Sequence, residues 1–303
     1  MSYHLVHILT HQSRLYIDRG CLVCEIPPDV QKRIPVQDTM GIIVAARGIS
    51  FSSDCISTLI ENGGFILHCN EKYQPIAKTV GLHKVIHSEI FEKQLKLSSE
   101  FSRDIWNKLL KAKIENQAFL LDNIGAKHKL WDYLEDGNID EGNAARHYWK
   151  FYFSKFGRRA PKQREHKDAG YKVNQMLNYS YAVMGAIVHR SAVGHGLNPS
   201  LGVHHKFRFR TDPLVYDLLE PLRPICDFML LRYYLENQRK PIEDYIKYVA
   251  KDLTGLRVKI NAEKTLKLIY SVDRYISSVA DCFYCGVVKS LFIPVLNEII
   301  IDE

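Results

Sequence analysis

Residues 197–224 read LNPSLGVHHKFRFRTDPLVYDLLEPLRP. Within this stretch, Asp212 and Pro213 predict the start of a helix. An aspartate at the N-cap accepts hydrogen bonds from free backbone amides, and a proline has no amide to satisfy at the first helical position. Asp217 and Glu220 then stand three residues apart, which places both carboxylates on one face of the predicted helix.

A pair of imidazoles, His204 and His205, lies shortly before this helix. Two carboxylates and a nearby histidine on a rigid element supply the oxygen and nitrogen ligands that divalent cations bind. A second interpretation needs no metal, because acidic residues are common in the first turns of helices and paired histidines are usually surface or satisfied core residues. The spacing alone leaves both interpretations open.

A second acidic helix is predicted earlier in the chain, with Asp140 as its N-cap and Glu141 as its first residue. A glutamate at this position also has an ordinary capping role. Ala144 and Ala145 follow one turn later, and such small side chains let another element approach closely, as a site assembled from two distant helices requires. The aromatic residues further along, such as Tyr148, are predicted to be core rather than a platform for stacking bases.

The rest of the chain divides by its periodicity into a β-rich and a helical part. Strands are predicted at 14–18, 21–26, 40–45, 65–69 and 76–80, with a short helix capped by Ser53 among them. Helical signals then continue to about residue 289. We therefore predict an α+β protein with a small β-rich N-terminal domain, residues 1–86, followed by a larger all-α catalytic domain, residues 87–303.

The composition is that of a globular protein with a mild positive charge. The 303 residues contain 41 basic and 34 acidic side chains, which gives a net charge of +7 with histidine neutral. This is compatible with a polyanionic partner but only weakly favours one. No signal peptide or membrane span is recognised, so a cytoplasmic location is expected.

Seven cysteines, an odd number, do not indicate a disulfide framework. Four of the cysteines form two pairs with the spacing CxxC, Cys21/Cys24 and Cys282/Cys285. A zinc site is not expected from them, because the first pair lies in a predicted strand whose residues i and i+3 face opposite ways, and most of the chain separates the two pairs.

A run of basic residues follows the second acidic helix. Gly157 and Pro161 predict a loop there rather than a helical face. The candidates for contacts with DNA phosphates are Arg158, Arg159, Lys162 and Arg164, extended by Arg208 and Arg210. A solvated loop without a ligand is the alternative.

Four motifs in the same order resemble the CRISPR adaptation integrase (Cas1) family in its type II form, with subtype II-C as one option. They are KIENQA at 113–118, EGNAARHYW at 141–149, NQMLNYSY at 174–181, and GLNPSLGVHH at 196–205 with DLLEP at 217–221. The resemblance covers most of the chain after about residue 100. Tyr216 departs from the family pattern, in which an aspartate stands at that position, so Asp217 and Glu220 are the carboxylates that remain.

The resemblance implies which residues carry the chemistry. Glu141, His205 and Glu220 are expected to be catalytic and to bind Mg²⁺ or Mn²⁺. Asp217 and His204 are candidates of second rank, Asp217 because it can orient a ligand or a water molecule.

The resemblance also implies a reaction and partners. The 3′-hydroxyl of a short foreign DNA fragment is expected to attack a phosphodiester at the edge of the CRISPR repeat, once on each strand. Expected partners are double-stranded DNA, a second copy of the chain, the small Cas2 protein that bridges two such dimers and, as a further option, the type II effector nuclease. The alternatives are a metal-dependent structure-specific nuclease, in which water replaces the 3′-hydroxyl, and a non-catalytic DNA-binding scaffold.

Overall fold

The computed structural model describes residues 4–81, 88–135, 140–166, 169–206, 211–237, 242–260, 264–288 and 291–300. The chain divides into two compact units, one of residues 1–84 with 241–254, the other of residues 85–240 with 255–303. The domain ranges expected from the sequence do not assign 241–254 to the first unit. In the described part of the chain, no helix is long and apolar enough to cross a membrane.

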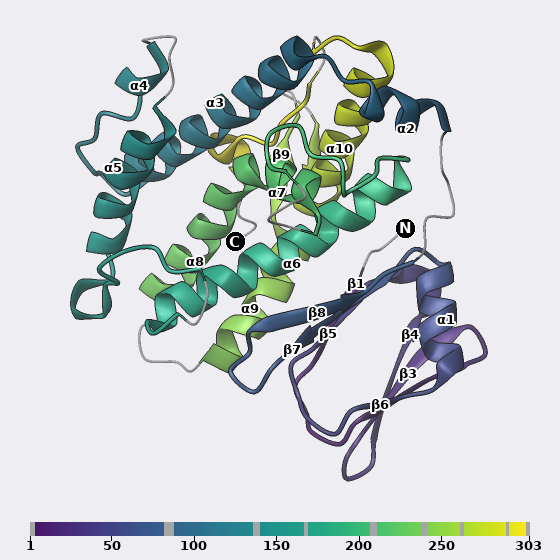
Figure 1. Ribbon diagram of the computed structural model, residues 1–303. Coiled ribbons are helices and arrows are strands. Elements are labelled where there is room, and N and C mark those ends of the chain that lie inside the picture. The colour runs from purple at the N-terminus through teal and green to yellow at the C-terminus, as the bar shows by residue number, and fades with distance from the viewer. Residues whose placement is uncertain are drawn as a thin grey trace. The chain divides into compact units, whose positions relative to one another are not determined.

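Two four-stranded sheets form the body of the first unit (Figure 1). The first has the order β1 (His4–Ile8), β5 (Thr39–Val44), β7 (Phe65–Cys69) and β8 (Pro75–Thr79). Its first three strands are parallel, and β8 is antiparallel to β7. The second has the order β4 (Val30–Pro35), β3 (Cys21–Ile26), β2 (Arg14–Asp18) and β6 (Ser50–Phe51).

The helix α1 (Ser53–Glu61) packs onto this unit because one of its faces is apolar. Cys55 and Leu59 are fully buried in a cluster with residues of both sheets, among them Leu15 and Ile42. The N-cap is Ser52, whose hydroxyl accepts a hydrogen bond from the Cys55 amide at 3.1 Å. The predicted cap, Ser53, is therefore wrong by one residue.

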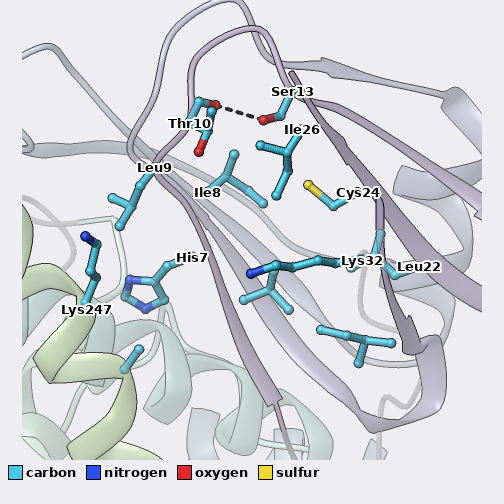
Figure 2. Close-up of a pocket in the computed structure, with 13 residues that line it drawn as sticks. His7, Ile8, Leu9, Thr10, Ser13, Leu22, Cys24, Ile26, Lys32 and Lys247 are labelled. Atoms are coloured by element: carbon cyan, nitrogen blue, oxygen red, sulfur yellow. Dashed lines mark hydrogen bonds between the residues drawn. The ribbon is translucent and has the colours of Figure 1, made fainter. Parts of the chain in front are cut away.

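A cavity of about 400 Å³ lies in the first unit beside β1 and α9 (Ile242–Gly255). Figure 2 shows the mostly apolar side chains around it, with His7, Lys32 and Lys247 as its basic members. Burial lowers the pKa of His7 to about 4, so its imidazole is neutral at pH 7. No residue predicted to be catalytic lines this cavity.

The second unit is mostly helical. Its helices are α2 (Ser88–Leu95), α3 (Ser99–Asn123), α4 (Asp132–Glu135), α5 (Glu141–Ser154), α6 (Lys172–Gly194), α7 (Pro213–Leu219), α8 (Arg223–Glu236) and α10 (Leu268–Cys285). The predicted order of a β-rich part before a helical part is confirmed. The second unit differs from the expected all-α domain by a small sheet of β10 (Thr265–Lys267), β9 (Arg257–Lys259) and β11 (Ile299–Ile300). Strands of two or three residues are too short to produce a periodic signal.

Two long helices organise this unit (Figure 1). Helix α6 is buried over most of its length and packs against α7, α8 and α10. Helix α3 packs against α5, against α8 and against the 3₁₀ turn Glu220–Leu222. Because α3 touches both acidic elements, it brings together two motifs that are far apart in the sequence.

Candidate active site

A buried lysine joins the two acidic motifs. Lys113 of α3 has its Nζ 2.8 Å from Glu141 Oε1 and 2.7 Å from Glu220 Oε2. Lys113 is only 9% exposed, and lysine is rarely buried to this degree unless its charge is paired. The carboxylates of Glu141 and Glu220 therefore both contact one ammonium group, that of Lys113.

Glu220 lies between two cations. Arg223 donates from Nε to Glu220 Oε1 at 2.9 Å, while Lys113 contacts the other carboxylate oxygen. Burial by itself raises the pKa of Glu220, but the charges of Arg223 and Lys113 outweigh that effect and lower the pKa to about 2. The carboxylate is therefore ionised at all pH values near neutrality.

Asp217 anchors the loop that carries His204 and His205, called here the histidine loop. Its buried carboxylate accepts hydrogen bonds from the backbone amides of Val203, His204 and His205, at 2.8, 3.1 and 3.0 Å. It also lies 2.6 Å from His205 Nδ1. A carboxylate accepts hydrogen bonds, so Nδ1 is the donor, and in the neutral ring the lone pair then lies on Nε2. Nε2 is then the ring nitrogen that can bind a cation.

The two histidines differ in what holds them. His204 stacks on the Trp106 indole, with 3.9 Å between ring centroids and 3° between planes. His205 meets the same indole edge-on, at 5.8 Å and 88°. Trp106 lies seven residues before Lys113 on α3, and residues seven apart share a helix face. One face of α3 thus supports both the histidine loop and the acidic pair.

Gly202 lies against the same loop. A Cβ at this position would overlap the carbonyl oxygen of His205 and would lie 2.9 Å from Asp217 Oδ2. The backbone of Gly202 therefore approaches the orienting carboxylate more closely than any other residue type allows.

We expect Gly202→Ala to lower the free energy of unfolding by about 2 kcal/mol, because the added methyl must displace the loop from Asp217. Urea unfolding at pH 7 measures the effect. Gly194→Ala is the matched control, since a Cβ there meets nothing within 4 Å. Equal stability of the two variants would show that the loop accommodates the methyl group.

Arg223 packs against a buried hydrogen-bond network of Tyr181, Tyr148 and Asp227. Its guanidinium lies over the ring of Tyr181, 4.7 Å from the centroid. The hydroxyls of Tyr181 and Tyr148 both donate to the carboxylate of Asp227, which is 1% exposed. Burial raises the pKa of Asp227 to about 6, although the two tyrosine hydrogen bonds oppose this rise. The predicted core role of Tyr148 is confirmed, and the hydrogen bond to Asp227 adds a function that its aromatic character did not indicate.

The C-terminal segment is tied to the turn that carries Glu220. The buried amide of Asn116 donates to the carbonyl oxygens of Pro221 at 2.9 Å and Pro294 at 3.1 Å. Its Oδ1 accepts from the Leu296 amide at 2.7 Å. Asn116 stands three residues after Lys113, so the KIENQA motif holds both the side chain and the backbone around Glu220.

The predicted DNA contacts fall into three groups. Arg158 and Arg159 lie on the 3₁₀ turn Gly157–Arg159 and are exposed, as is Lys162. Arg208 and Arg210 lie outside the described residues.

Arg164 forms the third group, since its side chain packs against α6. Its guanidinium donates to Asn174 Oδ1 at 3.3 Å and to Asn178 Oδ1 at 2.6 Å, and it lies 5.1 Å from the Tyr181 ring centroid. These contacts give the two asparagines of the NQMLNYSY motif a structural role.

The donor set fits a divalent cation by its chemistry. Two carboxylates already share one cation, and the hydrogen bond of His205 Nδ1 to Asp217 leaves Nε2 as the ring nitrogen that can bind a metal. Within the described residues, no three side chains of His, Cys, Asp or Glu are grouped closely enough to hold a metal ion. Lys113 takes the position between the carboxylates, so binding a metal there requires its ammonium to shift.

Residues missed at the sequence level include Lys113 and Trp106. A lysine in a helical motif ordinarily indicates a solvated face, and its burial depends on partners from two other elements. Asp212 is the N-cap residue of α7 and Pro213 begins the helix, as predicted, but the Asp212 side chain makes no capping hydrogen bond. The Asp212 carboxylate instead lies 3.8 Å from His189 Nε2.

Comparison with known proteins gives a consistent result. The family described as "CRISPR associated protein Cas1" matches residues 6–138 and 138–266. A CRISPR-associated endonuclease Cas1 of Neisseria meningitidis serogroup C is 29% identical over 215 residues, which cover 68% of each chain. A Cas1 endonuclease of Saccharolobus solfataricus is 26% identical, covering 77% of this chain and 73% of the relative.

Solved structures share the fold. A casposase bound to its integration product superposes with a TM-score of 0.83 at 16% identity, covering 96% of this chain and 93% of the casposase. A Cas1 protein from Thermotoga maritima gives 0.79 at 14% identity, covering 96% and 99%. A chain of a Cas6-RT-Cas1–Cas2 complex gives 0.77 at 12% identity, covering 97% of this chain and 36% of that one.

Proposed function

The chain belongs to the Cas1 family, and on that premise we propose that it is a CRISPR adaptation integrase. It inserts short foreign DNA fragments into the CRISPR array by a metal-dependent transesterification. The observation that carries this proposal is the meeting of Glu141 and Glu220 around one cation, together with the hydrogen bond that orients His205 through Asp217. We assign the chain to type II on its motifs.

Glu141, Glu220 and His205 Nε2 would hold Mg²⁺ or Mn²⁺, and the mixed oxygen and nitrogen donors favour Mn²⁺ somewhat. When bound, such a cation screens the carboxylates from DNA phosphate and stabilises negative charge on phosphoryl and leaving oxygens. The protein's own contribution is orientation. Asp217 fixes the tautomer of His205, while Arg223 fixes one oxygen of Glu220.

The reaction conserves the number of phosphodiester bonds. The fragment's 3′-oxygen bonds to a phosphorus atom of the repeat strand, and the bond between that phosphorus and the strand's own 3′-oxygen breaks. The proton lost from the attacking hydroxyl is balanced by the one that the departing 3′-oxygen gains. Since no oxidant or nucleotide is consumed, the principal task of the site is to hold the two DNA ends in line.

The scaffold alternative is disfavoured by a specific contact. It requires Glu141 to serve only as a cap for its helix, but Asp140 is the N-cap of α5 and accepts from the Asn143 amide at 2.9 Å. Glu141 instead pairs with Lys113. The nuclease alternative keeps the same site, and the endonuclease names of the relatives favour it as a second activity.

We propose double-stranded DNA and Cas2 as partners. The casposase bound to its integration product supports the first, and the Cas6-RT-Cas1–Cas2 complex supports the second. A homodimer, association with the type II effector nuclease, and a cytoplasmic location complete the proposal on the basis of the family resemblance.

A joining assay tests the integrase proposal. Fragments with free 3′-hydroxyls, Mn²⁺, Cas2 and a plasmid carrying the cognate repeat should yield fragments covalently joined to the plasmid. Fragments with 3′-deoxy or 3′-phosphate ends should bind without joining, because they lack the nucleophile. Nicking that is equal with both kinds of fragment, without joined product, would support the nuclease and contradict the integrase.

The exposed basic turn carries its own prediction. Replacing Arg158, Arg159 and Lys162 together with glutamine should weaken DNA binding regardless of sequence. The slope of log affinity against log salt concentration should become less steep by about 2 to 3. Each phosphate contact releases counterions when DNA binds, and the variant makes about three fewer such contacts. Titrations at several salt concentrations measure it. An unchanged slope would mean that this turn is merely solvated.

A further inference from the structure

Fixed cations offset most of the negative charge around the acidic pair. Lys113 and Arg223 supply two positive charges within contact distance of the carboxylates. Glu141 and Glu220 supply two negative charges, and Asp217 adds a third through its contact with His205. Three carboxylates therefore face two fixed cations before any metal or DNA arrives.

The position of Lys113 makes its charge matter most. Its ammonium contacts both carboxylates that a metal would use, whereas Arg223 contacts only Glu220. With both fixed cations in place, a divalent ion gives the cluster an excess of one positive charge. A DNA phosphodiester, with one negative charge, removes that excess. Without the charge of Lys113, the divalent ion and Arg223 together balance the three carboxylates, and no DNA phosphate is needed.

We propose that Lys113 is a positioning residue that makes metal binding depend on DNA. In the free protein its ammonium holds Glu141 and Glu220 together and opposes the entry of a divalent cation. When DNA phosphate enters, the added negative charge favours the metal, and the ammonium shifts from the carboxylates. This inference rests on the proposed function, because it concerns the metal site of the integrase reaction. Its consequence is a site that becomes active only on DNA.

Mn²⁺ binding measured by titration calorimetry, with and without a short DNA duplex, tests the proposal. The wild type should bind Mn²⁺ at least about tenfold more tightly with DNA than without it. Lys113→Met should bind Mn²⁺ at least about tenfold more tightly than the wild type in the absence of DNA, and should gain little when DNA is added. Lys113→Arg, which keeps the charge, should behave like the wild type.

Two controls separate this effect from others. Lys111→Met removes the same charge from the same helix, but Lys111 is exposed and pairs with Glu115, so it should leave Mn²⁺ affinity unchanged. Lys113→Gln keeps hydrogen-bond donors toward the carboxylates and replaces the methionine variant if that one fails to fold. Thermal melting verifies folding in each case.

The outcomes distinguish this inference from the function on which it rests. Unchanged Mn²⁺ affinity in DNA-free Lys113→Met, or an equal gain from DNA in that variant and the wild type, would overturn the role of Lys113. The role of Lys113 would also be overturned if DNA did not raise the Mn²⁺ affinity of the wild type. Fragment joining would still occur in these cases. If the wild type neither bound Mn²⁺ nor joined fragments, the proposed function itself would fail.

Discussion

Glu220→Gln should abolish fragment joining, with a loss of about a thousandfold or more, because a neutral amide cannot replace the carboxylate as a ligand of the proposed cation. It should also destabilise the protein. Glu220 is 7% exposed, and removing its charge leaves buried Lys113 and partly buried Arg223 without their shared partner. Breaking a buried ion pair in this way costs about 3–5 kcal/mol. Urea unfolding and the joining assay measure the two effects.

The pH dependence provides an independent test of Glu220. Its pKa in the folded protein is about 2, below the ordinary value of 4.5. A lowered pKa stabilises the folded state above the ordinary value, and this stabilisation is lost as pH falls from about 4.5 toward 2. The difference corresponds to about 3 kcal/mol. Unfolding of the wild type at pH 7 and pH 3 should reveal the loss, and Glu220→Gln should lack this part of it.

Glu236→Gln is the matched control for both measurements. Glu236 also pairs with an arginine, Arg232 at 3.3 Å, but its side chain is 51% exposed. Exposed pairs of this kind contribute about 0.5 kcal/mol. If Glu220→Gln changed stability no more than Glu236→Gln, the buried pairing with Lys113 and Arg223 would not be a stabilising interaction.

Asp217→Asn should have the second largest effect, with Mn²⁺ affinity and joining reduced by about a hundredfold. The asparagine NH₂ group cannot accept the hydrogen bond from His205 Nδ1, so the imidazole changes tautomer and Nε2 becomes protonated. The asparagine oxygen can still accept from the amides of Val203 and His204, but the NH₂ group also deprives the His205 backbone amide of its acceptor, at a cost of about 2 kcal/mol.

The tautomer of His205 can be observed directly by ¹⁵N NMR of the imidazole. The wild type should show Nδ1 protonated, and Asp217→Asn should show Nε2 protonated. Asp212→Asn is the control within the same motif, because the Asp212 carboxylate lies beside His189. An unchanged tautomer in Asp217→Asn, with joining intact, would remove Asp217 from the orienting role.

Local signals in the sequence were sufficient for the elements with strong patterns. The hairpin of β2 and β3 follows from alternation on both sides of a turn, and its predicted ranges, 14–18 and 21–26, match the strands. The start of α5 at Glu141 follows from the capping preference of Asp140. Both depend on residues that are neighbours in the chain, so sequence analysis can recover them.

The interactions around the acidic pair depend on residues that are distant in the chain. The burial of Lys113 depends on Glu141 and Glu220, neither of which is on its own helix. At the sequence level, Asp217 ranked second, as a residue that can orient a ligand or a water molecule. The structure separates it from Glu220, since Asp217 holds the histidine loop and Glu220 lies between two cations. Periodicity cannot distinguish two buried carboxylates with different partners.

The central claim is that Glu141, His205 and Glu220 bind a single divalent cation. Calorimetry of Mn²⁺ binding in the presence of DNA tests it most directly, using Glu141→Gln, His205→Ala, Glu220→Gln and the double variant Glu141→Gln/Glu220→Gln. We expect one ion per chain in the wild type and at least about a tenfold loss in each single variant. The double variant should lose much less than the product of the two single effects, because ligands of one ion act together. Unchanged affinity in all three single variants, with the proteins folded, would contradict the claim.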